Sequence, residues 1–202
     1  MKIIVIGATG IIGSAVAKAL AGKHEVIGAS RKSTSHPVDI TDAASIRYLF
    51  SSVGQFDAVV SVAGGAAYKP LAELTDADFA MSLGYKLMGQ INVARLAVSH
   101  LPDGGSITLT SGTYALEAGA NGAAIAVVNS GIHGFVTAAA AELPRGLRIN
   151  AVSPPFVGAL KLNETKSHVE SMTAEDVALA YLDAVDGHAT GSVIDTRRYA
   201  RR

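Results

Sequence analysis

The chain has 202 residues, 49% of them hydrophobic, which predicts a single domain over 1–202 with a sizeable core. Its 17 basic and 17 acidic side chains cancel, which argues against nucleic acid or an anionic membrane surface as a partner and favours a small molecule. Cysteine is absent, which excludes disulfides and thiol catalysis and fits a cytoplasmic protein. No apolar run reaches the roughly 20 residues of a membrane span, which predicts a soluble protein.

Short apolar strands alternate with longer alanine-rich segments along the chain. We predict strands at 3–6, 25–28, 58–61, 106–110, 147–152 and 192–195, and helices at 12–21, 43–52, 76–100, 122–143 and 174–185. This alternation predicts a single-domain α/β fold, a doubly wound parallel sheet (Rossmann fold) of about seven strands with helices on both faces. The segment 153–173 contains Pro154 and Pro155 and follows the carboxyl end of a strand. We expect it to be a loop over the substrate.

A glycine turn joins the first predicted strand to the first helix. Gly7 permits the tight turn, Gly10 allows a ligand to approach the backbone, and Gly13 allows the helix to pack close to the strand. Free backbone N–H groups and the positive end of the helix dipole then point at one spot, which suits a pyrophosphate. The alternative is an ordinary glycine turn between two packed elements.

Further stretches resemble, in order, the landmarks of the short-chain dehydrogenase/reductase family. Residues 38–42 resemble its Asp-Val-Thr-Asp stretch, 61–65 its Asn-Asn-Ala-Gly, 108–111 the strand that ends in the catalytic serine, and 148–154 its Arg-Val-Asn-Ala-Val-Ala-Pro segment. The resemblance implies a nicotinamide cofactor, hydride transfer to or from a small carbonyl or alcohol, and a homo-oligomer formed through helices 76–100 and 122–143. Alanines buried against the chain's own sheet explain the composition of those helices equally well. The implied cofactor contacts are Gly7, Thr9, Gly10, Ile11, Ile12, Gly13, Asp39, Ile40, Ala63, Gly64, Gly65 and Pro154.

The residues after the second strand indicate which cofactor is preferred. Relatives that prefer NAD place an acid here to bind the ribose hydroxyls, whereas this chain has Ser30, Arg31 and Lys32. A guanidinium holds a 2′-phosphate well, so we predict NADP(H) with Ser30 and Arg31 among its contacts. Ordinary solvated charges in a loop are the alternative.

The catalytic tyrosine of the family, and the lysine four residues after it, are both missing. Alignment of the helix 122–143 puts Ile125 and Asn129 at those positions, and neither side chain supplies a proton or a positive charge. Lys86 occupies the position of a family asparagine and returns a positive charge; a lysine that snorkels to solvent or caps a carbonyl is the alternative. The predicted catalytic set is Ser111, Lys86, Tyr114 and Asn129, with Tyr114 as the substitute acid and His133 as a less favoured one.

Two functions fit these residues. The first is an NADP-dependent oxidoreductase with a non-standard catalytic set, favoured by Ser111 and Lys86. The second is a catalytically inactive NADP(H)-binding sensor, favoured by the loss of the tyrosine and lysine. No metal is expected because the six histidines show no ligand spacing. Ser111 lacks the Gly-x-Ser-x-Gly turn of a hydrolase.

Overall fold

Six parallel strands form one sheet in the order β2-β1-β3-β4-β5-β6 in the computed structural model, which describes residues 1–117, 119–155 and 172–200. The strands are β1 (Lys2–Ile6), β2 (Glu25–Ala29), β3 (Ala58–Ser61), β4 (Ser106–Thr110), β5 (Arg148–Ser153) and β6 (Val193–Asp195). The main helices are α1 (Ile11–Ala21), α2 (Ala43–Val53), α3 (Asp76–Ser82), α4 (Gly89–Ala97), α5 (Ala123–Glu142) and α6 (Ala174–Asp186). The predicted fold class, with its alternating strands and helices, is confirmed.

The expected number of about seven strands was wrong, because the described part of the chain forms six. After β2 the backbone makes only an isolated bridge between Ser30 and Pro37. After β6 it turns directly into a short 3-10 helix, Thr196–Tyr199.

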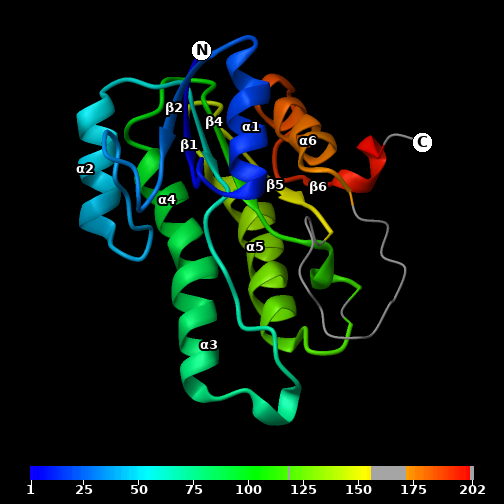
Figure 1. Cartoon of the computed structure of the whole chain (residues 1–202). Coiled ribbons are helices and arrows are strands. Elements are labelled where there is room, and N and C mark those ends of the chain that lie inside the picture. Colours follow the sequence, from blue (N-terminus) through cyan, green and yellow to red (C-terminus); the bar gives the residue numbers. More distant parts are fainter. Residues whose placement is uncertain (118, 156–171, 201–202) are drawn as a thin grey trace.

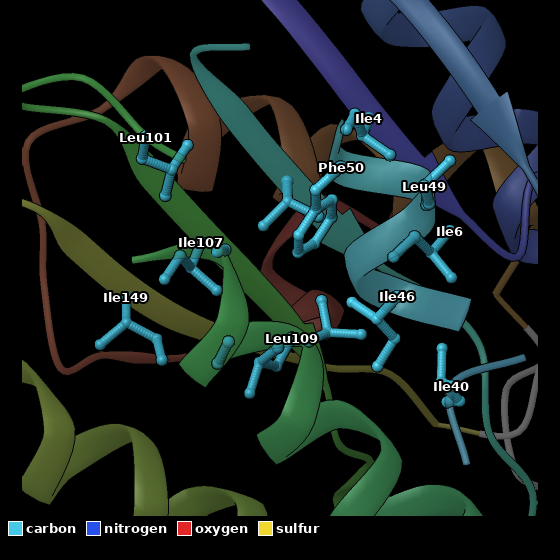
Figure 2. Close-up of a cluster of buried hydrophobic side chains, with 14 of the residues drawn as sticks. Ile4, Ile6, Ile40, Ile46, Leu49, Phe50, Leu101, Ile107, Leu109 and Ile149 are labelled. Atoms are coloured by element: carbon cyan, nitrogen blue, oxygen red, sulfur yellow. The ribbon is translucent and has the colours of Figure 1, made fainter. Parts of the chain in front are cut away.

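Helices cover both faces of the sheet because alternate strand residues point to opposite sides. In β1, Ile4 and Ile6 pack under α2 and α4, whereas Ile3 and Val5 pack under α1 and α6. Figure 1 shows α1 and α6 side by side on one face and α2, α4 and α5 on the other. Figure 2 shows the larger cluster, in which Phe50 of α2 lies among buried strand residues.

The predicted helix 76–100 is one rod with a π-helical segment, Leu83–Met88, between α3 and α4. Its start is capped reciprocally, because the Thr75 hydroxyl accepts from the Asp78 N–H while the Asp78 carboxylate accepts from the Thr75 N–H. A π-helical turn is wider than an α-helical one and occurs often at functional sites. Here the wide turn carries Tyr85 and Lys86.

Helix α5 corrects one expectation from the sequence. Its 20 residues, Ala123–Glu142, are long and apolar enough to cross a membrane by length and composition alone. In the structure Val128, Ile132 and Val136 are fully buried, and the last two pack against the sheet. These three residues form the buried face of α5, and packing within the fold explains their apolar character.

The glycine turn leads to a testable prediction about stability. A Cβ at Gly13 would lie 2.0 Å from the Gly7 carbonyl oxygen, so Gly13→Ala must push α1 away from the turn. We expect it to lower the free energy of unfolding by about 1–3 kcal/mol in a urea titration. The matched control is Gly134→Ala in α5, where an added Cβ meets nothing within 4 Å and helix propensity raises stability by about 0.5–1 kcal/mol. Equal stabilities for the two variants would contradict the close packing.

Candidate functional site

A cavity of about 730 Å³ lies at the carboxyl ends of β1, β2 and β3. Gly7, with φ of +92°, turns the chain there, and a Cβ on it would lie 2.9 Å from the Ala63 nitrogen. Only glycine fits this turn between two strand ends. The lining includes, of the predicted cofactor contacts, Gly7, Thr9, Gly10, Ser30, Arg31, Ile40, Ala63 and Gly64.

Arg31 lies over an aromatic ring at one end of this cavity. Its guanidinium carbon is 5.0 Å from the centroid of the Tyr85 ring, a cation–π contact that orients the positive charge. The neighbouring Ser30 hydroxyl is buried and, among the described residues, has no hydrogen-bond partner. A buried hydroxyl without a partner is costly unless a ligand or water satisfies it. This end of the cavity therefore offers a cation and a free hydroxyl to an anionic group.

Several predicted contacts lie elsewhere. Ile11 is mostly exposed, Ile12 and Pro154 line a second cavity, and neither Gly13 nor Gly65 lines either cavity. Asp39 lines a separate hollow of about 480 Å³ beside Arg31. Its Oδ1 accepts hydrogen bonds from the Thr41 N–H and hydroxyl, at 2.9 and 2.7 Å, which lower the pKa of the Asp39 carboxyl below its usual value.

The second cavity, of about 230 Å³, shares Val62, Gly64 and their loop with the first. It brings together the four predicted catalytic residues from four different segments: Lys86 from the π-helical turn, Ser111 from the end of β4, Tyr114 from a 3-10 turn, and Asn129 from α5. Their catalytic roles stay predictions. The expected substrate loop 153–173 begins at this cavity with Pro154 and Pro155, and its residues 156–171 lie outside the described part of the chain.

Lys86 is held against the end of β4. Its Nζ donates to the Ser111 backbone oxygen at 3.0 Å, and burial lowers the pKa of Lys86 to about 8. One turn later, the Gln90 amide exchanges two hydrogen bonds of 2.7 Å with the Thr110 backbone N–H and carbonyl. The Gln90 amide thus pairs with the strand as a neighbouring strand would. This pairing fixes the helix so that Lys86 meets Ser111.

The Ser111 side chain has a partner on α5. Its Oγ lies 2.7 Å from Nε2 of His133, which is partly buried. Burial lowers the pKa of His133 below its usual value. His133 was predicted only as a less favoured substitute acid, and its contact with Ser111 was not expected.

Tyr114 is poorly suited to be the substitute acid. Burial, and a hydrogen bond with Tyr68, raise the pKa of the Tyr114 hydroxyl above its ordinary value near 10. Gly122 packs on the ring, since a Cβ there would lie 2.4 Å from Tyr114 carbon atoms. A phenol with a raised pKa is a weaker acid than a free one, which weighs against Tyr114 as the substitute acid, and its catalytic role stays a prediction.

Asn129 and Ile125 line the second cavity from α5. Among the described residues the buried Asn129 Oδ1 has no hydrogen-bond partner, which leaves an acceptor for a bound hydroxyl group. No group of three or more His, Asp or Glu residues within the described ranges is arranged to hold a metal ion. The polar groups of the site therefore include a lysine, a serine–histidine pair, a tyrosine hydroxyl and an amide oxygen without a described partner.

Comparisons with known proteins identify the family of this chain. A family model described as enoyl-(acyl carrier protein) reductase matches residues 7–187. The chain belongs to the short-chain dehydrogenase/reductase family. Its curated relatives include a hydroxynaphthalene reductase of Aspergillus fumigatus, 34% identical over 63% of this chain and 48% of that protein. A putative short-chain type dehydrogenase/reductase of Mycolicibacterium smegmatis is 31% identical over 69% of this chain and 53% of that one. The chain spans about half the length of these curated relatives.

Solved structures of similar size match over nearly the whole chain. A protein of Listeria innocua is 41% identical with a TM-score of 0.92, covering 96% of this chain and 98% of that one. A small-chain dehydrogenase in complex with NADPH is 31% identical with a TM-score of 0.87, covering 96% and 95%. The fold and the oxidoreductase family are thereby established, and a nicotinamide cofactor is supported.

Tyr85, Gln90 and the His133–Ser111 contact are the features of the site that were not predicted. Tyr85 and Gln90 lie next to, and four residues after, Lys86 on the same helix, so the helical period placed them near the site. Nothing in their types marks a function, because an aromatic or amide side chain on a mostly apolar helix is usually a packing residue. Only the three-dimensional contact distinguishes them.

Proposed function

We propose that the protein is an NADP(H)-dependent oxidoreductase that reduces a small carbonyl compound, or oxidises the corresponding alcohol, with a non-standard catalytic set. The observation that carries this proposal is the second cavity, which shares Val62 and Gly64 with the first. A dinucleotide held by the first cavity would meet the second at these shared residues, where Lys86 and Ser111 line the wall.

The residues present fit this cofactor. The Gly7 turn leaves no room for a side chain beside the first cavity, so backbone N–H groups at the start of α1 can approach a pyrophosphate. Arg31 and the unpaired Ser30 hydroxyl suit a 2′-phosphate. The NADPH complex of the similar small-chain dehydrogenase supports the same choice.

Lys86 and Ser111 would act on the substrate oxygen. When bound, the reduced cofactor supplies a hydride to the carbonyl carbon. The Lys86 ammonium stabilises the negative charge that develops on the oxygen, and a low-dielectric pocket strengthens this interaction. The Ser111 hydroxyl holds the same oxygen by a hydrogen bond, so the two side chains replace the charge and the contact that the missing pair supplies in relatives.

The second candidate is a catalytically inactive NADP(H)-binding sensor. The observation that favours it is Ile125, which lines the second cavity where the family carries its tyrosine. An isoleucine moves no proton. A sensor binds NADPH in the first cavity with no need for Lys86 or Ser111.

NADPH consumption with a panel of aldehydes, ketones and quinones separates the two functions. For the oxidoreductase we expect turnover of at least one compound, and a loss of at least about tenfold in kcat/KM in Ser111→Ala, since a hydrogen bond to a developing charge is removed. If the wild type binds NADPH tightly but turns over no compound, and Ser111→Ala binds NADPH equally tightly, the protein is the sensor. Ser51→Ala on the exposed side of α2 is the matched control, because Ser51 lines neither cavity.

A homo-oligomer and a cytoplasmic location complete the proposal. Met81 of α3, Met88 of the π-helical segment and Val127 of α5 are exposed apolar side chains on the two helices expected to form the subunit contact. Burial of these side chains in a partner would remove apolar surface from water. Sedimentation equilibrium, which measures the mass in solution, tests this expectation.

A further inference from the structure

The contact between Ser111 and His133 links the second cavity to a side chain of α5 that does not line it. Ser111 lines the cavity and His133 does not, while Ser111 Oγ and His133 Nε2 lie 2.7 Å apart. The imidazole therefore reaches the cavity only through the serine hydroxyl. Since His133 is partly exposed, its ring can exchange protons with water without opening the cavity.

We propose that His133 and Ser111 form a proton relay, in which His133 supplies through the Ser111 hydroxyl the proton that the missing tyrosine supplies in relatives. His133 acts through Ser111 and is a positioning residue in this sense, whereas Ser111 contacts the substrate. The inference rests on the proposed function and adds to it the source of the proton.

The protonation state of His133 decides what Ser111 presents to the cavity. A protonated imidazole donates from Nε2 to Ser111 Oγ, so the hydroxyl proton is free to bond a carbonyl oxygen. A neutral imidazole with its proton on Nδ1 accepts from the hydroxyl, so Ser111 presents a lone pair that can accept the proton of an alcohol. The pair therefore serves reduction in its charged form and oxidation in its neutral form.

The reduction step balances through this relay. The carbonyl carbon accepts a hydride from the reduced nicotinamide, and the electron pair of the C=O π bond moves to the oxygen. That oxygen bonds the Ser111 hydroxyl proton, Ser111 Oγ takes the Nε2 proton of His133, and the neutral imidazole recovers a proton from water. The carbonyl becomes an alcohol, the nicotinamide is oxidised, and Ser111 ends as it began.

The other groups near α5 do not fill this role. The elements packed closely against α5 carry Tyr85 and Lys86 in the π-helical segment, Tyr114 in its 3-10 turn, Arg148 in β5, and Asp76 and Asp78 in α3. Asp78 pairs with Lys69, and Arg148 donates to the carbonyls of Ala184 and Val185. Of the set, Lys86 and Tyr114 also line the cavity; Lys86 Nζ is bonded to the Ser111 backbone oxygen, and burial raises the pKa of the Tyr114 hydroxyl above its ordinary value.

The decisive variant is His133→Gln, because the glutamine amide reaches about as far as Nε2 and keeps a donor for Ser111 Oγ but cannot titrate. We expect kcat for reduction to fall by about 10²-fold. The wild-type pH profile of reduction should show one step below pH 6.5 from His133 and one near pH 8 from Lys86. His133→Gln should lose the first step and keep the second. His188→Gln, an exposed histidine, is the control and should match the wild type. Activity within threefold of wild type with an unchanged profile would overturn the relay and leave the proposed function standing. No turnover by the wild type would overturn both.

A second measurement needs neither cofactor nor substrate. The proton resonance of His133 Cε1, assigned by its loss in His133→Gln, is titrated by NMR in the free protein. We expect its midpoint below 6.5 in the wild type and a changed midpoint in Ser111→Ala, since that variant removes the partner of Nε2. A titration identical in both proteins would show that the pair is not formed in solution, and would overturn the relay whatever the activity.

Discussion

Lys86→Met is expected to lower kcat/KM for carbonyl reduction by about 10²–10³-fold, because it removes the cation beside the developing charge. Methionine keeps the length and most of the packing of the lysine stem, so the cavity should keep its shape. NADPH oxidation with the best substrate of the panel measures the loss. A reduction rate within threefold of wild type would show that Lys86 plays no part in the chemistry.

The pH dependence distinguishes a charge effect from a packing effect. The Lys86 pKa is lowered to about 8 by burial, so the ammonium is present at pH 7 and lost as pH rises through about 8. Wild-type reduction should therefore fall across that range, and Lys86→Met should show no such step. Lys69→Met is the matched control, since Lys69 pairs with Asp78 at the start of the same rod and lines neither cavity.

Lys86→Met should also be more stable than the wild type. The folded protein disfavours the charged form of Lys86, and the unfolded chain does not, so the wild type carries a penalty below pH 8 that is relieved as pH rises from about 8 to 10.5. We expect Lys86→Met to raise the free energy of unfolding at pH 7 by roughly 0.5–2 kcal/mol. A gain in stability with a loss of activity is the signature of a residue kept for function.

Arg31→Ala is expected to weaken NADPH binding by about 10 to 100-fold, because a charge-assisted hydrogen bond to a phosphate contributes about 1.5–3 kcal/mol. NADH lacks the 2′-phosphate, so its dissociation constant should change by less than about threefold. Titration of both cofactors by intrinsic or nicotinamide fluorescence measures the two constants. Equal losses for NADPH and NADH would contradict the assignment of Arg31 to the phosphate.

Two companion variants define how Arg31 works. Tyr85→Leu removes the ring under the guanidinium and should reproduce a smaller part of the NADPH loss, about three- to fivefold, since an exposed cation–π contact is worth about 0.5–1 kcal/mol. Tyr48→Leu is its control, because Tyr48 is exposed and lines only the neighbouring hollow. Equal effects of the two tyrosine variants would show that the stacking does not orient Arg31.

The fold was predictable almost to the residue because its signals are local. The predicted strands 58–61 and 106–110 match β3 and β4, and the predicted helix 43–52 matches α2 to within a residue. Apolar runs and helical periodicity are properties of neighbouring residues, so they can be recognised without knowledge of how the rest of the chain folds. The π-helical segment within 76–100 escaped prediction, because a change from an α- to a π-turn depends on what packs beside it.

The candidate site was predictable only in part. Gly7, Gly10 and Arg31 follow strand ends, where parallel sheets bind ligands, so their place near the first cavity followed from position in the sequence. Asp39 also follows a turn near this edge, yet its carboxylate turns to Thr41. A short local hydrogen bond decided its direction, and the chain order carries no signal for that.

The sequence alone determined the alternation of strands and helices, the glycine turn, and the absence of the family's tyrosine and lysine pair, because each is a property of residue type and order. The tertiary structure alone decided which side chains of the site contact one another. Gln90 ties α4 to β4, Lys86 meets the backbone of Ser111, and Ser111 meets His133, although 22 residues separate that last pair. Such contacts join elements that only packing brings together, and the proposed chemistry of this site depends on them.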